Sequence, residues 1–188
     1  MATTPARPEI LGYVAILDQP LLALASSTKV PPGLVLRAYD LASILRDSGV
    51  ATISGFHTLI ERDCLHFLLK GKQPVVICPA RGIARMRVPP EWKASIAEGR
   101  LLVVSRIPAH ERRVTAALAA ERNRFVAELC TAALVIHANP GSRTEAWCRD
   151  VLALGKPLWT PAAAENAHLV ALGARAFEIE RLPLFFEA

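Results

Sequence analysis

Short runs of consecutive apolar residues recur along the chain at a length that suits β-strands. Most of these runs show no alternation between apolar and polar positions, which is typical of strands covered on both faces in a parallel sheet. We predict six strands, at Leu21–Ser26, Val50–Ser54, Val75–Cys78, Leu101–Ser105, Ala133–His137 and Pro157–Thr160. Together they favour a buried, mainly parallel sheet.

Segments with apolar residues at helical spacing lie between these runs. The stripes consist of Leu34, Ala38, Leu41 and Leu45; of Ile60, Cys64, Phe67 and Leu68; of Val114, Leu118, Phe125 and Leu129; and of Trp147, Val151 and Leu154. A glycine follows three of the stripes, as is usual just past the end of a helix. The alternation of strands and helices predicts a Rossmann-like α/β fold, with a doubly wound sheet in three α/β/α layers. Ligands of such folds bind at the carboxyl ends of the strands.

The length of 188 residues suits one domain. We interpret residues 1–12 as a flexible lead-in and residues 13–188 as a single domain, because the start of the chain carries two prolines and no apolar signal region. No apolar run reaches the roughly 18 residues that cross a bilayer. We therefore expect a soluble, cytoplasmic protein without a membrane partner. Residues 161–188 are expected to add a small closing element that includes Phe185 and Phe186.

The four cysteines, Cys64, Cys78, Cys130 and Cys148, have no metal-type or C-x-x-C spacing. Each lies in an apolar run, which favours buried thiols in a reducing compartment. The segment 25–33 after the first predicted strand lacks the G-x-G-x-x-G fingerprint of dinucleotide binding. We therefore expect no metal and no cofactor.

The net charge of +5 is spread unevenly over the chain. Residues 31–160 hold 18 Lys and Arg against 11 Asp and Glu, whereas residues 161–188 hold two Arg against four Glu. A basic middle suggests an anionic partner, such as a nucleic acid, a nucleotide or phosphate. Aromatic residues make up only 6% of the chain, so an extended groove for stacking bases is not expected.

The fifth predicted strand runs into the turn Asn139–Glu145 and then a helix. Free backbone N–H groups at this helix start, together with the helix dipole, favour a phosphate or carboxylate. The alternative is plain capping, because Ser142-x-x-Glu145 forms a capping box. The two interpretations are compatible. The candidate binding residues of this turn are Gly141, Ser142, Arg143, Thr144 and Glu145.

Two further turns follow the second and third predicted strands. Ser54 and Gly55 open a helix that starts with a Thr58-x-x-Glu61 capping box, and His57 is either a ligand-binding residue or a capping partner. The segment Cys78–Arg87 carries three arginines in seven residues, so it is either a phosphate clamp or a solvated basic loop. Its candidate residues are Arg81 and Gly82.

Arg122 lies within the third helical stripe, with Leu118 and Phe125 on either side at helical spacing. A charge that faces an apolar surface needs a partner or a ligand. Glu145 is the expected protein partner, and a salt bridge and a ligand contact both remain open. The neighbouring Asn123 joins the candidate set. No nucleophile motif, P-loop or H-E-x-x-H motif is present, so no catalytic residue is assigned.

The sequence at these turns resembles the core of the DNA-processing protein A family (DprA, also called Smf), roughly from Tyr13 to Thr160. The resemblance rests on Ile16–Leu22, Ser54-Gly55, Cys78–Gly82, Arg122–Arg124 and the Gly141-Ser142 turn. It implies an extended Rossmann fold, single-stranded DNA as partner in DNA uptake or recombination, and a homodimer. Two basic groups that line the family's anion pocket are missing here, because their positions hold Ser27 and Thr58.

A second resemblance is to the Lonely Guy (LOG) phosphoribohydrolases. Arg122-Asn123 and the turn Pro140–Glu145 are similar to that family's Arg-Lys pair and its PGGxGTxxE turn, although one residue short. This resemblance implies a nucleoside-monophosphate phosphoribohydrolase in which Arg122 and Glu145 act together on an oxocarbenium-like transition state. A nucleotide-sensing module without catalysis is the third alternative. We rank single-stranded DNA binding first.

Overall fold

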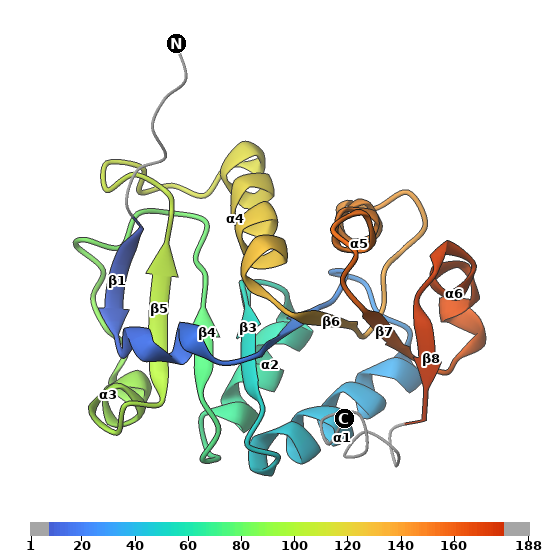
Figure 1. Ribbon diagram of the computed structural model, residues 1–188, viewed down its shortest axis with the longest axis horizontal. Coiled ribbons are helices and arrows are strands. Elements are labelled where there is room, and N and C mark those ends of the chain that lie inside the picture. Colours follow the sequence, from blue (N-terminus) through green and yellow to red (C-terminus); the bar gives the residue numbers. More distant parts are fainter. Residues whose placement is uncertain (1–7, 179–188) are drawn as a thin grey trace.

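The computed structural model describes residues 8–178, which form an eight-stranded sheet with helices on both faces (Figure 1). The strands are β1 Glu9–Gly12, β2 Leu21–Ala25, β3 Ala51–Ser54, β4 Val75–Ile77, β5 Leu101–Ser105, β6 Ala132–Val135, β7 Leu158–Pro161 and β8 Arg175–Phe177. Their order across the sheet is β1-β5-β4-β3-β2-β6-β7-β8. All neighbours are parallel except β1 and β5, which run antiparallel. The predicted α/β fold is confirmed.

Helices cover the sheet in the two outer layers. The helices are α1 Pro32–Asp47, α2 Leu59–Leu68, α3 Pro90–Ala97, α4 Ala116–Leu129, α5 Arg143–Ala153 and α6 Ala167–Leu172, with 3-10 helices at Val14–Asp18 and Ala164–Asn166. One core cluster joins the sheet to α4, α5 and α6, and the other joins it to α1 and α2, with α3 packed against it. The predicted three layers are therefore present.

The point where the strand order reverses lies between β2 and β6. From β2 the chain adds β3, β4 and β5 on one side, and then α4 leads back so that β6 pairs with the opposite side of β2. The helices that follow these two strands, α1 and α5, lie on opposite faces. Loops after such strands diverge and leave a crevice at their carboxyl ends, which is where doubly wound sheets bind ligands.

Two helix predictions need correction at their ends. Helix α4 begins at Ala116 with Thr115 as its N-cap, so Val114 lies before the helix and is 64% exposed. Leu154 follows α5 as its C-cap and is 52% exposed, so it does not belong to the apolar stripe. Helix α3 was not predicted, because Trp92 and Ile96 are the only large apolar residues in its eight positions.

The predicted flexible lead-in is wrong for residues 9–12, which form β1. The strand pairs with β5 from Glu9 opposite Ser105 to Gly12 opposite Leu102, and the Glu9 carboxylate accepts backbone N–H groups of Ile83 and Ala84. One backbone ladder and a charged anchor therefore order a segment whose own composition carries no strand signal. The boundary of the domain stays a prediction.

The end of the described chain continues the sheet. Beyond β7, residues 164–172 form the second 3-10 helix and α6, and β8 pairs parallel to β7. This agrees with a small closing element after residue 161, whereas Phe185 and Phe186 lie outside the described residues. Among residues 8–178, no helix has the length and apolar character that crossing a membrane requires.

Candidate functional site

The carboxyl ends of β2 and β6 are tied together by short hydrogen bonds. The Ser27 N–H donates to the His137 carbonyl over 2.8 Å, and the Asn139 N–H donates to the Ser27 hydroxyl over 3.0 Å. The Ser27 and Ser142 hydroxyls lie 3.4 Å apart. The switch point is therefore closed by neutral hydroxyl and backbone groups rather than by a basic side chain.

A small pocket lies next to this switch point, and we call it the switch-point pocket. It has a volume of about 30 Å³, which is room for about one or two water molecules. Its polar lining residues are Ser26, Ser54, Gly55, His57, Glu61, Arg122, Asn123 and Thr144. Elements β2, β3, α2, α4 and α5, or the turns that adjoin them, each contribute to it, so the fold brings distant parts of the sequence together.

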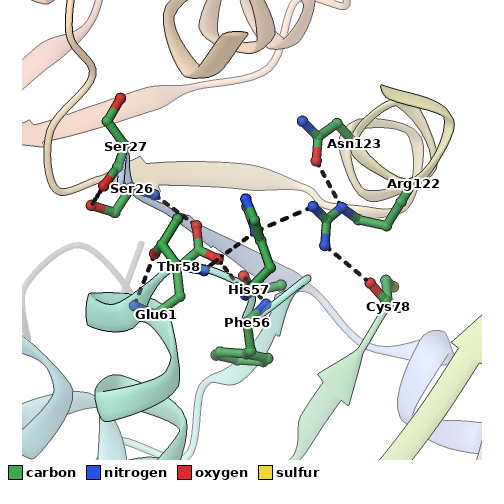
Figure 2. A network of polar contacts seen from close by, with 10 residues as sticks. Ser26, Ser27, Phe56, His57, Thr58, Glu61, Cys78, Arg122 and Asn123 are labelled. Atoms are coloured by element: carbon green, nitrogen blue, oxygen red, sulfur yellow. Dashed lines mark hydrogen bonds and ion pairs between the residues drawn. The ribbon is translucent and has the colours of Figure 1, made fainter. Parts of the chain in front are cut away.

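Arg122 projects from α4 toward His57 and Cys78 (Figure 2). It lines this pocket and is only 3% exposed. Its Nε donates to the Asn123 side-chain oxygen over 2.7 Å and its Nη1 to the Cys78 carbonyl over 3.4 Å. Its Nη2 lies 3.2 Å from Nδ1 of His57. Burial lowers the pKa of Arg122, and the charge of nearby Glu61 opposes that shift. Within residues 8–178, no salt bridge joins Arg122 to a carboxylate.

Gly55 makes room for this guanidinium group. A Cβ atom at Gly55 would overlap Nη1 and Cζ of Arg122, far inside van der Waals contact. Only glycine lets β3 end this close to α4 while Arg122 keeps its position. The structure thus gives a steric reason for the Ser-Gly pair that the sequence shows after the second predicted strand.

Glu61 is the polar centre of the turn between β3 and α2. Its Oε1 accepts the Ser26 N–H over 2.9 Å, and its Oε2 accepts the His57 N–H over 2.9 Å and the Thr58 N–H over 3.3 Å. The His57 ring atom Nδ1 lies 2.9 Å from the same Oε2. Burial alone would raise the pKa of Glu61, but these hydrogen bonds and the His57 charge outweigh it and lower the pKa.

His57 joins the buried acid to the buried base. Its Nδ1 faces both Glu61 and Arg122, while 54% of its side chain is exposed. The preceding Phe56 has a φ of 44°, a left-handed conformation that is uncommon outside glycine. In Figure 2 the Phe56 ring points away from Arg122, whereas the His57 ring points toward it. The turn therefore sends two successive side chains in opposite directions.

Comparison with known proteins identifies the family of this chain. The family model for DNA recombination-mediator protein A matches residues 3–182, nearly the whole chain. The chain belongs to this family. Among curated protein sequences none matches this family member significantly.

Three solved structures are similar to this family member in fold. DNA processing protein A from Helicobacter pylori, described for its single-stranded DNA binding mode, is 17% identical with a TM-score of 0.79 over 99% of this chain and 89% of its own. DNA processing protein A (DprA) from Streptococcus pneumoniae is 18% identical with a TM-score of 0.75 over 93% of this chain and 64% of its own. The molybdenum cofactor carrier protein from Chlamydomonas reinhardtii is 13% identical with a TM-score of 0.60 over 90% and 97%.

Thr58 and Ser27, at the two positions where the resemblance to the DNA-processing protein A family implies basic groups, make hydrogen bonds within this chain. Thr58 is buried as the N-cap of α2, where its hydroxyl accepts the Glu61 N–H over 3.2 Å. Ser27 is buried in the switch-point contacts described above. The side chain of this turn that contacts Arg122 is His57, one residue before Thr58.

The predicted partnership of Arg122 with Glu145 is wrong. Glu145 forms a salt bridge of 2.8 Å with Arg149, one turn further along α5, and accepts the backbone N–H of Gly141. The i,i+4 spacing makes Arg149 the nearest cation. These contacts tie Glu145 to its own helix and its preceding turn rather than to Arg122.

The Asn139–Glu145 turn caps its own helix. The Ser142 hydroxyl accepts the Glu145 N–H over 3.2 Å, which confirms the predicted N-cap, but Glu145 reaches the N–H of Gly141 rather than that of Ser142. Gly141 adopts a φ of 72°. Thr144 is the one candidate of this turn that lines the switch-point pocket, whereas Arg143 is exposed outside it.

Arg81 and Gly82 lie away from the switch-point pocket. The Ser105 hydroxyl donates to the Arg81 carbonyl over 2.8 Å, and the Gly82 N–H donates to the Glu111 carbonyl over 2.9 Å. A Cβ atom at Gly82 would meet the backbone of Pro108 and Ala109. The exposed Arg81 side chain lines two other hollows. The predicted site residues are thus divided between separate depressions.

Glu61 has a role in the site that the sequence pattern alone does not reveal. The capping box identified it, but only the fold brings the Ser26 N–H to its second oxygen. The cysteines are buried as predicted, and burial raises the pKa of Cys64, Cys78 and Cys148 to about 12. In the described part of the chain, no three His, Cys, Asp or Glu side chains gather in a metal-binding arrangement.

Proposed function

We propose that this chain binds single-stranded DNA at the carboxyl edge of its sheet, in DNA uptake or recombination. Membership of the DNA recombination-mediator protein A family supports a DNA-processing role. The fold is similar to that of the Helicobacter pylori protein, which is described as binding single-stranded DNA. The basic surplus of residues 31–160 supplies the charge that such a ligand requires.

The observation that carries this proposal is the partial neutralisation of Arg122. Its hydrogen-bond acceptors are the Cys78 carbonyl oxygen and the Asn123 amide oxygen, neither of which carries a full negative charge. The nearby imidazole nitrogen of His57 is shared with Glu61. A buried guanidinium without a carboxylate at ion-pair distance favours an anionic ligand, and its planar fork suits phosphate. The exposed His57 ring lies on the open side of the same pocket.

The size of the switch-point pocket sets what can enter it. About 30 Å³ admits phosphate oxygens at its rim rather than a whole base. A free nucleotide could present the same phosphate, so nucleotide binding is the alternative that a test must separate. The hydrolase alternative ranks lower, because Glu145 contacts Arg149 and Gly141, and none of the salt bridges among the described residues joins it to Arg122.

Arg122→Gln and Arg124→Gln form a matched pair for the test. Both residues lie on α4 and each substitution removes one positive charge, but Arg124 is exposed and paired with Glu121. We expect a labelled dT oligonucleotide to bind the wild type at low salt, with affinity falling as salt increases, in fluorescence anisotropy. Arg122→Gln should weaken binding about 10-fold or more, and Arg124→Gln about 2-fold.

Three controls complete this experiment. Arg122→Lys keeps the positive charge but loses the planar guanidinium group that can bind two phosphate oxygens, so we expect an intermediate affinity for the oligonucleotide. Circular dichroism checks that each variant is folded. A wild type that binds no oligonucleotide at low salt would overturn the proposal, and stabilisation by dTMP alone would favour the nucleotide alternative. The homodimer and the cytoplasmic location stay predictions, and light scattering of the purified chain tests the former.

A further inference from the structure

A larger hollow lies between α2 and α3, and we call it the α2–α3 hollow. Its volume is about 320 Å³, roughly ten times that of the switch-point pocket and within the range of about 300–1,000 Å³ usual for ligand sites. Its apolar lining residues are Phe56, Leu65, Leu69, Ile77, Pro79, Met86 and Trp92, and its charged or titratable ones are Arg62, His66, Arg81 and Glu91.

This hollow and the switch-point pocket share a wall. Gly55 lines both. The left-handed backbone at Phe56 directs its ring into the core cluster of α1 and α2, while His57 faces Arg122 (Figure 2). The turn Gly55–His57 therefore separates the switch-point pocket, which has room for a small anion, from the α2–α3 hollow, which has room for a planar ring.

A third hollow adjoins the α2–α3 hollow. It has a volume of about 200 Å³ and shares Arg81 and Met86 with the α2–α3 hollow. Its other cations are Arg85 and Arg112. Outward from the switch-point pocket, the order is thus a buried cation at Arg122, an apolar hollow, and then a group of arginines. In a single strand, each base branches from a sugar that lies between two phosphates, which matches this order of charge and apolar surface.

We propose that the α2–α3 hollow binds an unstacked nucleobase of a strand whose phosphate lies at the switch-point pocket. The inference rests on the proposed DNA function and adds to it where the base goes. Trp92 is half-buried and offers an aromatic surface, and base–aromatic stacking is tolerant of sequence. Met86 is a flexible apolar side chain that adapts to different ring shapes.

The charges around the hollow favour a nucleotide over a neutral apolar ligand. Arg62 and Arg81 are exposed at its rim, and Glu91 is the single acid beside them. Guanidinium groups bind phosphates and also stack on bases. The low aromatic content of the sequence predicts no extended groove for stacking bases. Binding of a single base in this hollow requires only one aromatic ring, that of Trp92.

The test compares a dT oligonucleotide with an abasic oligonucleotide of equal length and charge. The abasic strand keeps the phosphates, so only contacts to bases distinguish the two. We expect the wild type to bind the intact strand more tightly, and Trp92→Ala to lower that affinity about 5-fold to 100-fold while leaving the abasic strand unaffected. Trp92→Phe retains an aromatic ring and should keep the preference for the intact strand.

Two further variants separate charge from shape. Arg62→Ala and Lys93→Ala each remove one cation next to the hollow, but Lys93 does not line it. Arg62→Ala should weaken binding of the intact strand more than Lys93→Ala does. If Trp92→Ala is poorly folded by circular dichroism, Met86→Ala tests the same hollow through a smaller side chain.

The outcomes distinguish the two proposals. Equal affinity of the wild type for intact and abasic strands would overturn the base-binding role and leave the DNA-binding proposal standing. The same holds if Trp92→Ala and Met86→Ala both fold and both bind the two strands as the wild type does. A wild type that binds neither strand at low salt would overturn both proposals.

Discussion

The switch-point pocket and the α2–α3 hollow are neighbours of opposite character. In the first, a buried acid and a buried base hold their positions through contacts with His57, Ser26, Cys78 and backbone groups. In the second, apolar side chains form the floor and the charges stand exposed at the rim. Buried charges are costly to leave unpaired, whereas exposed ones are not. Substitutions of charged residues should therefore affect stability more at the switch-point pocket than at the rim of the α2–α3 hollow.

The same substitution in both places gives the largest expected difference. Glu61→Gln removes the charge that three backbone N–H groups and His57 face, so we expect a loss of about 3 kcal/mol in the free energy of unfolding. Glu91→Gln at the exposed rim should change it by less than about 0.5 kcal/mol. Urea denaturation measures both. Equal effects would show that the two hollows do not differ in this way.

A pair of glycine substitutions gives the next effect. Gly55→Ala forces Arg122 out of its position, and we expect a loss of about 2 kcal/mol together with weaker binding of single-stranded DNA. Gly33→Ala, in the first turn of α1 with open space around its Cβ position, should gain about 0.5 kcal/mol. Thermal unfolding compares them. A Gly55→Ala protein as stable as the wild type would mean that Arg122 is not held at this turn.

Acid pH should produce the smallest effect. Because folding lowers the pKa of Glu61, its stabilisation is complete above the ordinary glutamate value of about 4.3 and is lost as the pH falls through the lower folded value. The stability gap between wild type and Glu61→Gln should therefore narrow below about pH 4.3. Urea denaturation from neutral pH down to about pH 3 measures it. A gap that stays constant would contradict the lowered pKa.

The sequence predicts the sheet well because burial on both faces leaves a signal inside each segment. All six predicted strands are present; Leu101–Ser105 has the predicted ends, and the other five have at least one end shifted by one or two residues. The strand β1 escapes prediction because half of its side chains are exposed and its order depends on β5 and on contacts of Glu9 with residues 83 and 84. Pairing between distant segments leaves no local pattern.

The contacts within the site follow the same rule: contacts between residues close in sequence can be predicted, and contacts between distant residues cannot. Caps such as Thr58 and Ser142 are predicted because donor and acceptor lie three residues apart. The partners of Arg122 are not, because His57 and Cys78 lie 65 and 44 residues away. Glu145 shows the opposite case, since its partner Arg149 stands only four positions along the helix and was visible in the sequence.

The short strand β1 has a consequence for solubility. Its neighbour β5 reads Leu-Leu-Val-Val-Ser and is buried along its whole length, which is the composition of a segment that aggregates when its backbone is open. The four residues of β1 occupy that backbone and present an outer border that is brief and begins with the charged Glu9. A fragment that started after residue 12 would expose β5 to pairing with other molecules.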